Sequence, residues 1–148
     1  MVNATDVARA RLIATQAHEG QTDKAGVAYI GHPARIAARV AGDPAAEVVA
    51  WLHDVVEDCD HWTLDRLRAE GIPADLVAAV DAISKRPGEA SDDYYARVAA
   101  NPVALKVKYA DLADNSDPER LAKLDPATRE RLTRKYAHAR EVLASLAD

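Results

Sequence analysis

The residues from Glu47 to Asp58, EVVAWLHDVVED, place the strongest constraint on how this chain can fold. Read as one α-helix at about 100° per residue, this segment separates its apolar and ionisable side chains into opposite sectors. The apolar sector holds Val48, Val49, Leu52, Val55 and Val56, and the ionisable sector holds His53, Asp54, Glu57 and Asp58. We therefore predict a helix that packs one side against the protein and leaves the other side available for chemistry.

The ionisable sector of this segment contains an imidazole and carboxylates but no Lys or Arg. A helix that only faces solvent usually spreads basic residues along its polar side, where they pair with the acids. A divalent metal ion would supply the missing positive charge, because neighbouring His and Asp residues suit a mixed nitrogen and oxygen site. The alternative interpretation is a solvated acidic patch.

The composition of the chain favours a helical fold. Its 148 residues fit a single domain, spanning 1–148, that is large enough to bury its own core. Hydrophobic residues make up 49% of the sequence, but aromatic residues only 5%, with no Phe. Such a core has to be built from closely packed Ala, Val, Leu and Ile. Single Pro and Gly residues mark boundaries along the chain, so we predict an all-α bundle of roughly eight helices.

The charge and the termini exclude several classes of partner. A net charge of −5 argues against a nucleic-acid or membrane-surface partner, since both need a broad basic face. Apolar runs of membrane-spanning length are missing from the sequence. The single Cys and the charged N-terminal segment predict a cytoplasmic protein without a disulfide or a signal peptide. The expected partner is a small molecule, and the sequence leaves the oligomeric state open.

Two further segments carry polar residues that such a site needs. The segment GQTDKAGVAYIGHP is too rich in turn formers for a helix and brings Lys24, Tyr29 and His32 towards Pro33, where we predict the next helix to start. For Tyr29 we favour a packing role. The second segment runs from Pro102 to Asn115 and is predicted to be helical, with a stripe of polar residues formed by Lys108, Asp111 and Asn115. Asp114 is expected to face solvent or to support the site from behind.

The order of these motifs resembles a known enzyme family. A His, then His-Asp followed by Glu-Asp, then Asp is similar to the pattern of the HD-domain metal-dependent phosphohydrolases. The sequences GQTDKAGVAYIGHP, WLHDVVED and VKYADLADN more closely resemble the hydrolase domain of the RelA/SpoT family and its small stand-alone alarmone hydrolases. The likeness covers roughly residues 17–121, and it implies the helical HD-domain fold.

The resemblance also implies roles for individual residues. It makes Mn²⁺ the expected metal, although another divalent ion is an alternative, and it assigns as ligands His32, His53, Asp54 and Asp111. Glu57 and Asp58 match the acidic pair that acts in catalysis in the family. Positions that contact substrate in the family correspond to Lys24, Lys108 and Asn115.

The function implied by the resemblance is hydrolysis of a phosphorylated nucleotide by a metal-dependent (p)ppGpp 3′-pyrophosphohydrolase that releases pyrophosphate. Two alternatives stay open: an HD-domain nucleotidase or phosphohydrolase acting on another nucleotide, and a nucleotide-binding module without turnover. Glu57 and Asp58 favour an enzyme over a binding module, because a sensor needs no general acid or base.

Asp23 differs from the pattern of the family, which usually has a basic residue immediately before the lysine that corresponds to Lys24. An acidic side chain here adds repulsion towards a highly anionic ligand. On sequence grounds alone, we expect weaker affinity for guanosine tetraphosphate than in a typical family member. Replacing Asp23 with Arg is then expected to lower KM.

Overall fold

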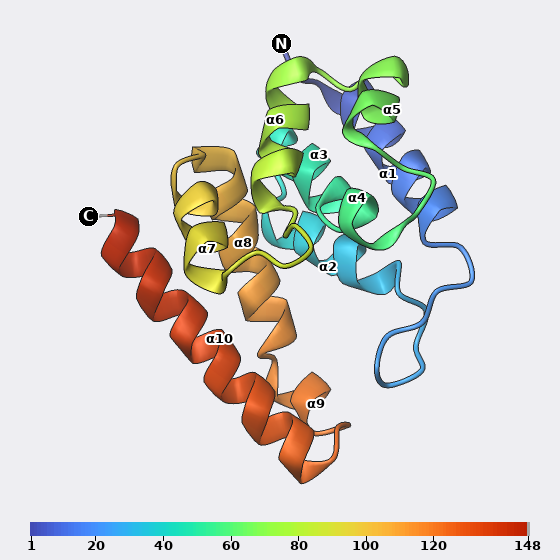
Figure 1. Ribbon diagram of the computed structural model, residues 1–148. Coiled ribbons are helices and arrows are strands. Elements are labelled where there is room, and N and C mark those ends of the chain that lie inside the picture. The colour runs from blue at the N-terminus through green and yellow to red at the C-terminus, as the bar shows by residue number, and fades with distance from the viewer. Residues whose placement is uncertain (148) are drawn as a thin grey trace.

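The fold was analysed in a computed structural model, which describes residues 1–147. Within these residues the regular secondary structure is entirely α-helical (Figure 1), apart from an isolated antiparallel bridge between Thr22 and Ala28. The helices are α1 (Ala4–Ala17), α2 (Gly31–Arg39), α3 (Pro44–Leu52), α4 (Val55–Asp58), α5 (Leu64–Ala69), α6 (Ala74–Ile83), α7 (Ser91–Ala99), α8 (Pro102–Asn115), α9 (Pro118–Leu121) and α10 (Pro126–Ala147). The predicted all-α bundle is confirmed. Because α4 and α9 are single turns, eight longer helices remain within the described residues, in agreement with the roughly eight that were predicted.

Side-chain caps and prolines set several helix starts. The side chain of Asn3 accepts hydrogen bonds from the backbone N–H groups of Thr5 and Asp6 at the start of α1. Asp43 and Asn101 cap α3 and α8 in the same way, and each is followed by a Pro at the first helical position. The Asn101 cap and Pro102 explain why α8 starts at the predicted residue, and the helix also ends at Asn115 as predicted.

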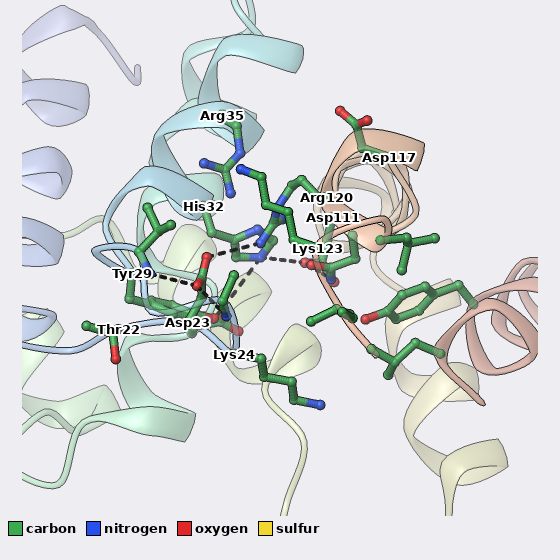
Figure 2. Close-up of a pocket in the computed structure, with 18 of the residues that line it drawn as sticks. Thr22, Asp23, Lys24, Tyr29, His32, Arg35, Asp111, Asp117, Arg120 and Lys123 are labelled. Atoms are coloured by element: carbon green, nitrogen blue, oxygen red, sulfur yellow. Dashed lines mark hydrogen bonds and ion pairs between the residues drawn. The ribbon is translucent and has the colours of Figure 1, made fainter. Parts of the chain in front are cut away.

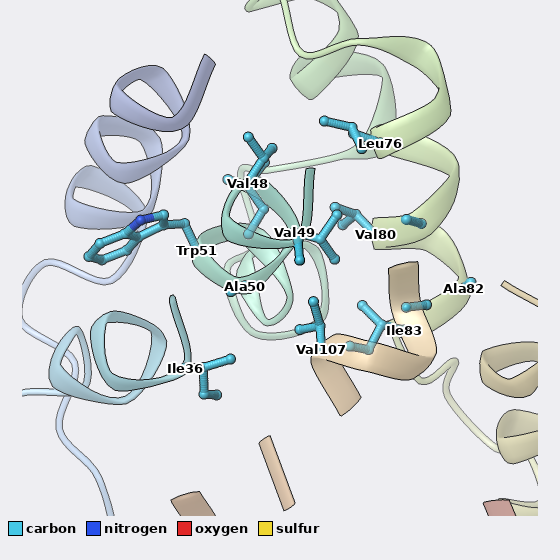
Figure 3. Packing of buried hydrophobic residues seen from close by; sticks show 14 of the residues in the cluster. Ile36, Val48, Val49, Ala50, Trp51, Leu76, Val80, Ala82, Ile83 and Val107 are labelled. Atoms are coloured by element: carbon cyan, nitrogen blue, oxygen red, sulfur yellow. The ribbon is translucent and has the colours of Figure 1, made fainter. Parts of the chain in front are cut away.

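The central helix α3 forms the middle of the core. It packs against α1, α2, α6 and α8, and α3 residues on more than one side are buried. Figure 3 shows Val48 and Val49 of α3 among Leu76, Val80 and Ile83 of α6. Small and β-branched side chains allow the helix axes to approach closely, so this core does not need Phe.

Two predicted boundaries are wrong. The segment from Glu47 to Asp58 is not one helix, because α3 ends at Leu52 and the chain turns at His53 and Asp54 before α4 begins. Helix α2 begins at Gly31, two residues before Pro33. A Pro is tolerated in the first turn of a helix because the N–H groups there have no intrahelical partner.

The last helix and the segment before α2 flank the bundle. Helix α10 packs on α7 and α8, and its N-terminal half extends with α9 beyond the other helices (Figure 1). The segment between α1 and α2 forms a loop, here called the 21–29 loop, closed by backbone hydrogen bonds between Asp23 and Val27 and between Tyr29 and Gln21. Among residues 1–147, we find no helix with the length and apolar character required to cross a membrane.

Candidate metal and substrate site

The predicted metal ligands come from α2, the α3–α4 turn and α8, and they meet at one point. His32 Nε2 lies 2.9 Å from Asp111 Oδ1 and 3.8 Å from Asp54 Oδ2. His53 Nε2 lies 3.0 Å from Asp54 Oδ2 and 3.5 Å from Asp111 Oδ1. The fold therefore brings two imidazole nitrogens and two carboxylate oxygens together from distant parts of the sequence.

The orientation of His53 fits a ligand. Its ring is buried, and Nδ1 donates a hydrogen bond to the Ala50 carbonyl over 2.7 Å. Nε2, on the other edge of the ring, faces the Asp54 and Asp111 carboxylates, and this buried atom makes no hydrogen bond of good geometry. A buried nitrogen without a partner is costly, whereas coordination of a cation would satisfy it.

The two carboxylates are held in their ionised form. Burial opposes the charge of Asp54, but the adjacent His53 lowers the pKa of this carboxyl to about 2. Burial likewise opposes the charge of Asp111, and Lys108 together with the histidines lowers its pKa well below the usual value. Two anionic oxygens facing two imidazole nitrogens form a donor set suited to a first-row divalent ion.

Neighbouring side chains fix the two carboxylates in place. The Asp111 carboxylate accepts hydrogen bonds from Lys108 Nζ over 3.0 Å and from Asn115 Nδ2 over 3.1 Å. The Tyr29 hydroxyl donates to Asp54 Oδ2, so Tyr29 does more than pack. The predicted substrate residues Lys108 and Asn115 thus contact a predicted metal ligand, and their contact with substrate stays a prediction.

A cavity of about 710 Å³ opens in front of this cluster. Its walls include His32, Asp54 and Asp111 of the predicted metal set, together with Lys24, Glu57, Asp58 and Asn115. His53 and Lys108 are not among the residues that line it, and His53 supports the cluster from the buried side. The structure thus places most of the predicted site residues around one space.

Glu57 and Asp58 occupy α4, directly after the Asp54 turn. Burial, reinforced by the charges of Asp54 and Glu57, raises the pKa of Asp58 to about 6. Burial also raises the pKa of Glu57, whose Oε2 accepts the backbone N–H of Lys85 over 3.1 Å. Carboxyl groups that hold and release protons closer to neutral pH are suited to general acid and base chemistry.

Basic residues also line the cavity, and the sequence motifs do not reveal them. They are Arg35 of α2, Arg120 of α9, Lys123 in the turn between α9 and α10, and Lys135 of α10. Figure 2 shows Arg35, Arg120 and Lys123 on the same side of the site as His32 and Asp111. Sequence reasoning missed Arg120, Lys123 and Lys135 because α9 and α10 reach the site only through the tertiary fold.

Asp23 stabilises the 21–29 loop. Its Oδ1 accepts the backbone N–H groups of Ala25 over 2.9 Å and of Val27 over 3.0 Å, and its Oδ2 lies 3.6 Å from Arg120 Nη2 (Figure 2). An Arg at position 23 would lose these loop bonds. The sequence-based expectation that such a substitution lowers KM ignores this role.

Comparison with known proteins gives a consistent result. No family model matches the chain. It is 33% identical to a GTP pyrophosphokinase of Streptomyces coelicolor over 153 residues, which cover 95% of this chain and 17% of the relative. It is 35% identical to a guanosine-3′,5′-bis(diphosphate) 3′-pyrophosphohydrolase of Vibrio cholerae over 147 residues, covering 92% of this chain and 20% of the relative. The chain thus spans about a fifth of these relatives' length.

A solved structure has the same fold. A metazoan ortholog of SpoT that hydrolyzes ppGpp superposes with a TM-score of 0.78 and 18% identity, covering 97% of this chain and 88% of that one. The fold therefore defines the chain as an all-α domain of the type found in that hydrolase. The sequence matches confirm the resemblance to RelA/SpoT-type enzymes that the three motifs indicate.

Proposed function

We propose that this protein is a metal-dependent phosphohydrolase of a phosphorylated nucleotide, specifically a (p)ppGpp 3′-pyrophosphohydrolase. The observation that carries the proposal is the meeting of His32, His53, Asp54 and Asp111 at a cavity that also holds Glu57 and Asp58. Related proteins named as 3′-pyrophosphohydrolases support the choice of reaction.

The four converging residues would hold a divalent ion, for which we propose Mn²⁺. Bound there, such an ion supplies Lewis-acid polarisation of a phosphoryl oxygen and lowers the pKa of water. The protein's own contribution begins with orientation. Tyr29 and Lys108 hold the Asp54 and Asp111 carboxylates, and this preorganisation reduces the rearrangement needed when substrate binds.

Glu57 and Asp58 are proposed to move protons. A water molecule attacks the phosphorus attached to the 3′ oxygen of the ribose, and one carboxylate of the pair accepts its proton. The bond between phosphorus and the 3′ oxygen breaks, and the other member gives a proton to that oxygen. The products are pyrophosphate and a nucleotide with a free 3′ hydroxyl. Burial raises the pKa of both carboxyl groups, which brings their proton exchange closer to neutral pH.

The cations around the cavity support a substrate with several phosphates. Burial lowers the pKa of Lys135, and repulsion from Lys108, Lys85, Lys24 and Arg131 lowers it further. A group of basic side chains that repel one another becomes more stable when an anion binds between them. In an acidic protein, this arrangement favours a polyphosphorylated nucleotide over an uncharged ligand.

A substrate screen tests the proposal. Purified protein with Mn²⁺ is incubated with guanosine tetraphosphate, guanosine pentaphosphate, nucleoside monophosphates and dinucleotide cofactors, and the products are separated by anion-exchange chromatography. We expect GDP and GTP from the two alarmones. Good turnover of another nucleotide without turnover of the alarmones would favour the broader phosphohydrolase function, and binding without any turnover would favour a nucleotide-binding module.

A further inference from the structure

Asp114 of α8 is a buried carboxylate that the mechanism above does not use. Only 1% of its surface is exposed, yet it accepts hydrogen bonds from three side chains. His32 Nδ1 lies 2.7 Å from its Oδ2, Arg35 Nε lies 2.8 Å from its Oδ1, and Arg120 Nη1 lies 2.5 Å from its Oδ2. A carboxylate is stable inside a protein only with such partners.

The bond from His32 determines how this ring faces the metal cluster. With the Nδ1 proton directed at Asp114, Nε2 faces Asp111 and Asp54 on the opposite edge of the ring. A carboxylate behind a metal-binding histidine fixes the tautomer, orients the ring and makes the coordinating nitrogen more basic. Asp114 therefore stands in the place where an outer residue tunes a metal ligand.

Arg120 extends this network to the 21–29 loop, which also lines the cavity. One nitrogen of its guanidinium contacts Asp114, and the other lies 3.6 Å from Asp23 Oδ2 in the 21–29 loop. The same Asp23 holds the backbone N–H groups of Ala25 and Val27 through its Oδ1. A single side chain thus connects the loop that carries Lys24 to the carboxylate behind His32.

We propose that Asp114 and Arg120 are positioning residues that hold the metal cluster and the 21–29 loop in fixed positions relative to each other. Asp114 orients His32, and Arg120 fastens the 21–29 loop to the same carboxylate through its two-pronged guanidinium. The KM effect given below rests on the proposed function. Metal affinity and loop protection are measured without substrate, so a failure of the proposed function is distinguishable from a failure of this inference.

The first test replaces Asp114 with Asn, which keeps the shape but removes the charge that pairs with His32. We expect Mn²⁺ affinity, measured by isothermal titration calorimetry, to fall about 10- to 100-fold, the usual effect of losing such a partner. The control is Asp81→Asn, since Asp81 is an exposed partner of Arg86 outside the site. Affinity that is equal in both variants and in the wild type would overturn the role of Asp114.

The second test replaces Arg120 with Lys and does not depend on removing a buried charge. Lys keeps the positive charge but cannot contact Asp114 and Asp23 with two separate prongs. In chelator-treated protein, we expect amide hydrogen exchange at Ala25 and Val27 to become faster by about tenfold, because the loop opens more often. The control is Arg134→Lys, since Arg134 is exposed on α10.

Steady-state kinetics provide a further test, because a purely structural role of Arg120 would not affect KM selectively over kcat. If the alarmones are cleaved, Arg120→Lys is expected to raise KM more than it lowers kcat, because Lys24 is then less well placed for ground-state binding. Unchanged exchange at Ala25 and Val27 would overturn the connection between Arg120 and the loop, whatever the substrate is.

Discussion

His53 and Asp54 are adjacent in the sequence, and the turn between α3 and α4 directs both side chains to one point, with His53 Nε2 3.0 Å from Asp54 Oδ2. In an unbroken helix, consecutive side chains diverge by about 100°. The break in the helix therefore lets neighbouring residues act as two ligands of one site. It also places α4, with Glu57 and Asp58, at the edge of the same cavity.

The first prediction concerns metal binding. Replacing His53 with Ala removes the buried ring nitrogen that faces Asp54 and Asp111, so bound Mn²⁺ should fall from about one ion per chain to a negligible amount. Elemental analysis after gel filtration measures the content, and Asp81→Ala serves as the control. Retention of the full metal content by the His53 variant would show that the ion binds elsewhere.

The second prediction separates chemistry from metal binding. Glu57→Gln should keep nearly all of the metal, because Glu57 bonds to the Lys85 backbone and not to the ligand cluster. Its turnover should fall by a factor of about 10² or more, the usual effect of losing an acid–base group. Steady-state kinetics and elemental analysis on the same preparation measure both quantities. Loss of the metal together with activity would identify Glu57 as a ligand.

The third prediction concerns the 21–29 loop. Asp23→Arg should raise KM for the alarmones, because it removes the bonds to Ala25 and Val27 and repels Arg120. Asp23→Asn is the matched control, since its amide oxygen still accepts the two loop N–H groups. A lower KM in the Arg variant would instead support the simple charge argument drawn from the sequence.

The fourth prediction concerns stability. Leu52 is fully buried at the end of α3, directly before the ligand pair, so Leu52→Ala should lower the free energy of unfolding by about 2–5 kcal/mol. Urea denaturation of the chelator-treated protein measures this loss, and Leu12→Ala at an exposed position of α1 should change it little. Equal stability of the two variants would contradict the packing described for α3.

Local sequence signals predicted much of the fold. Asn101 and Pro102 specify the start of α8, because a side-chain cap and a fixed proline φ act within a few residues. The break after Leu52 was not predictable, since Val55 continues the apolar spacing of the helix. The bond from His53 Nδ1 to the Ala50 carbonyl and the burial around it become visible only in three dimensions.

The sequence predicted the metal ligands of the site but not the basic residues of α9 and α10 or the burial of Asp114. The ligand types and their order in the sequence indicated the metal cluster. Arg120 of α9 and Lys135 of α10 line the cavity, and no local sequence pattern predicts that these helices reach it. The burial of Asp114 was also not fixed by the sequence, because a carboxylate near a helix end is usually solvated unless distant cations pair with it.

The measurement that tests the central claim most directly follows the oxygen of the attacking water. Guanosine tetraphosphate is hydrolysed with Mn²⁺ in ¹⁸O-labelled water, with Glu57→Gln as a control for contaminating activity, and the products are examined by mass spectrometry. We predict label in pyrophosphate and none in GDP, because water attacks phosphorus and the 3′ oxygen leaves with the ribose. Label in GDP, or release of orthophosphate in place of pyrophosphate, would contradict the proposed reaction.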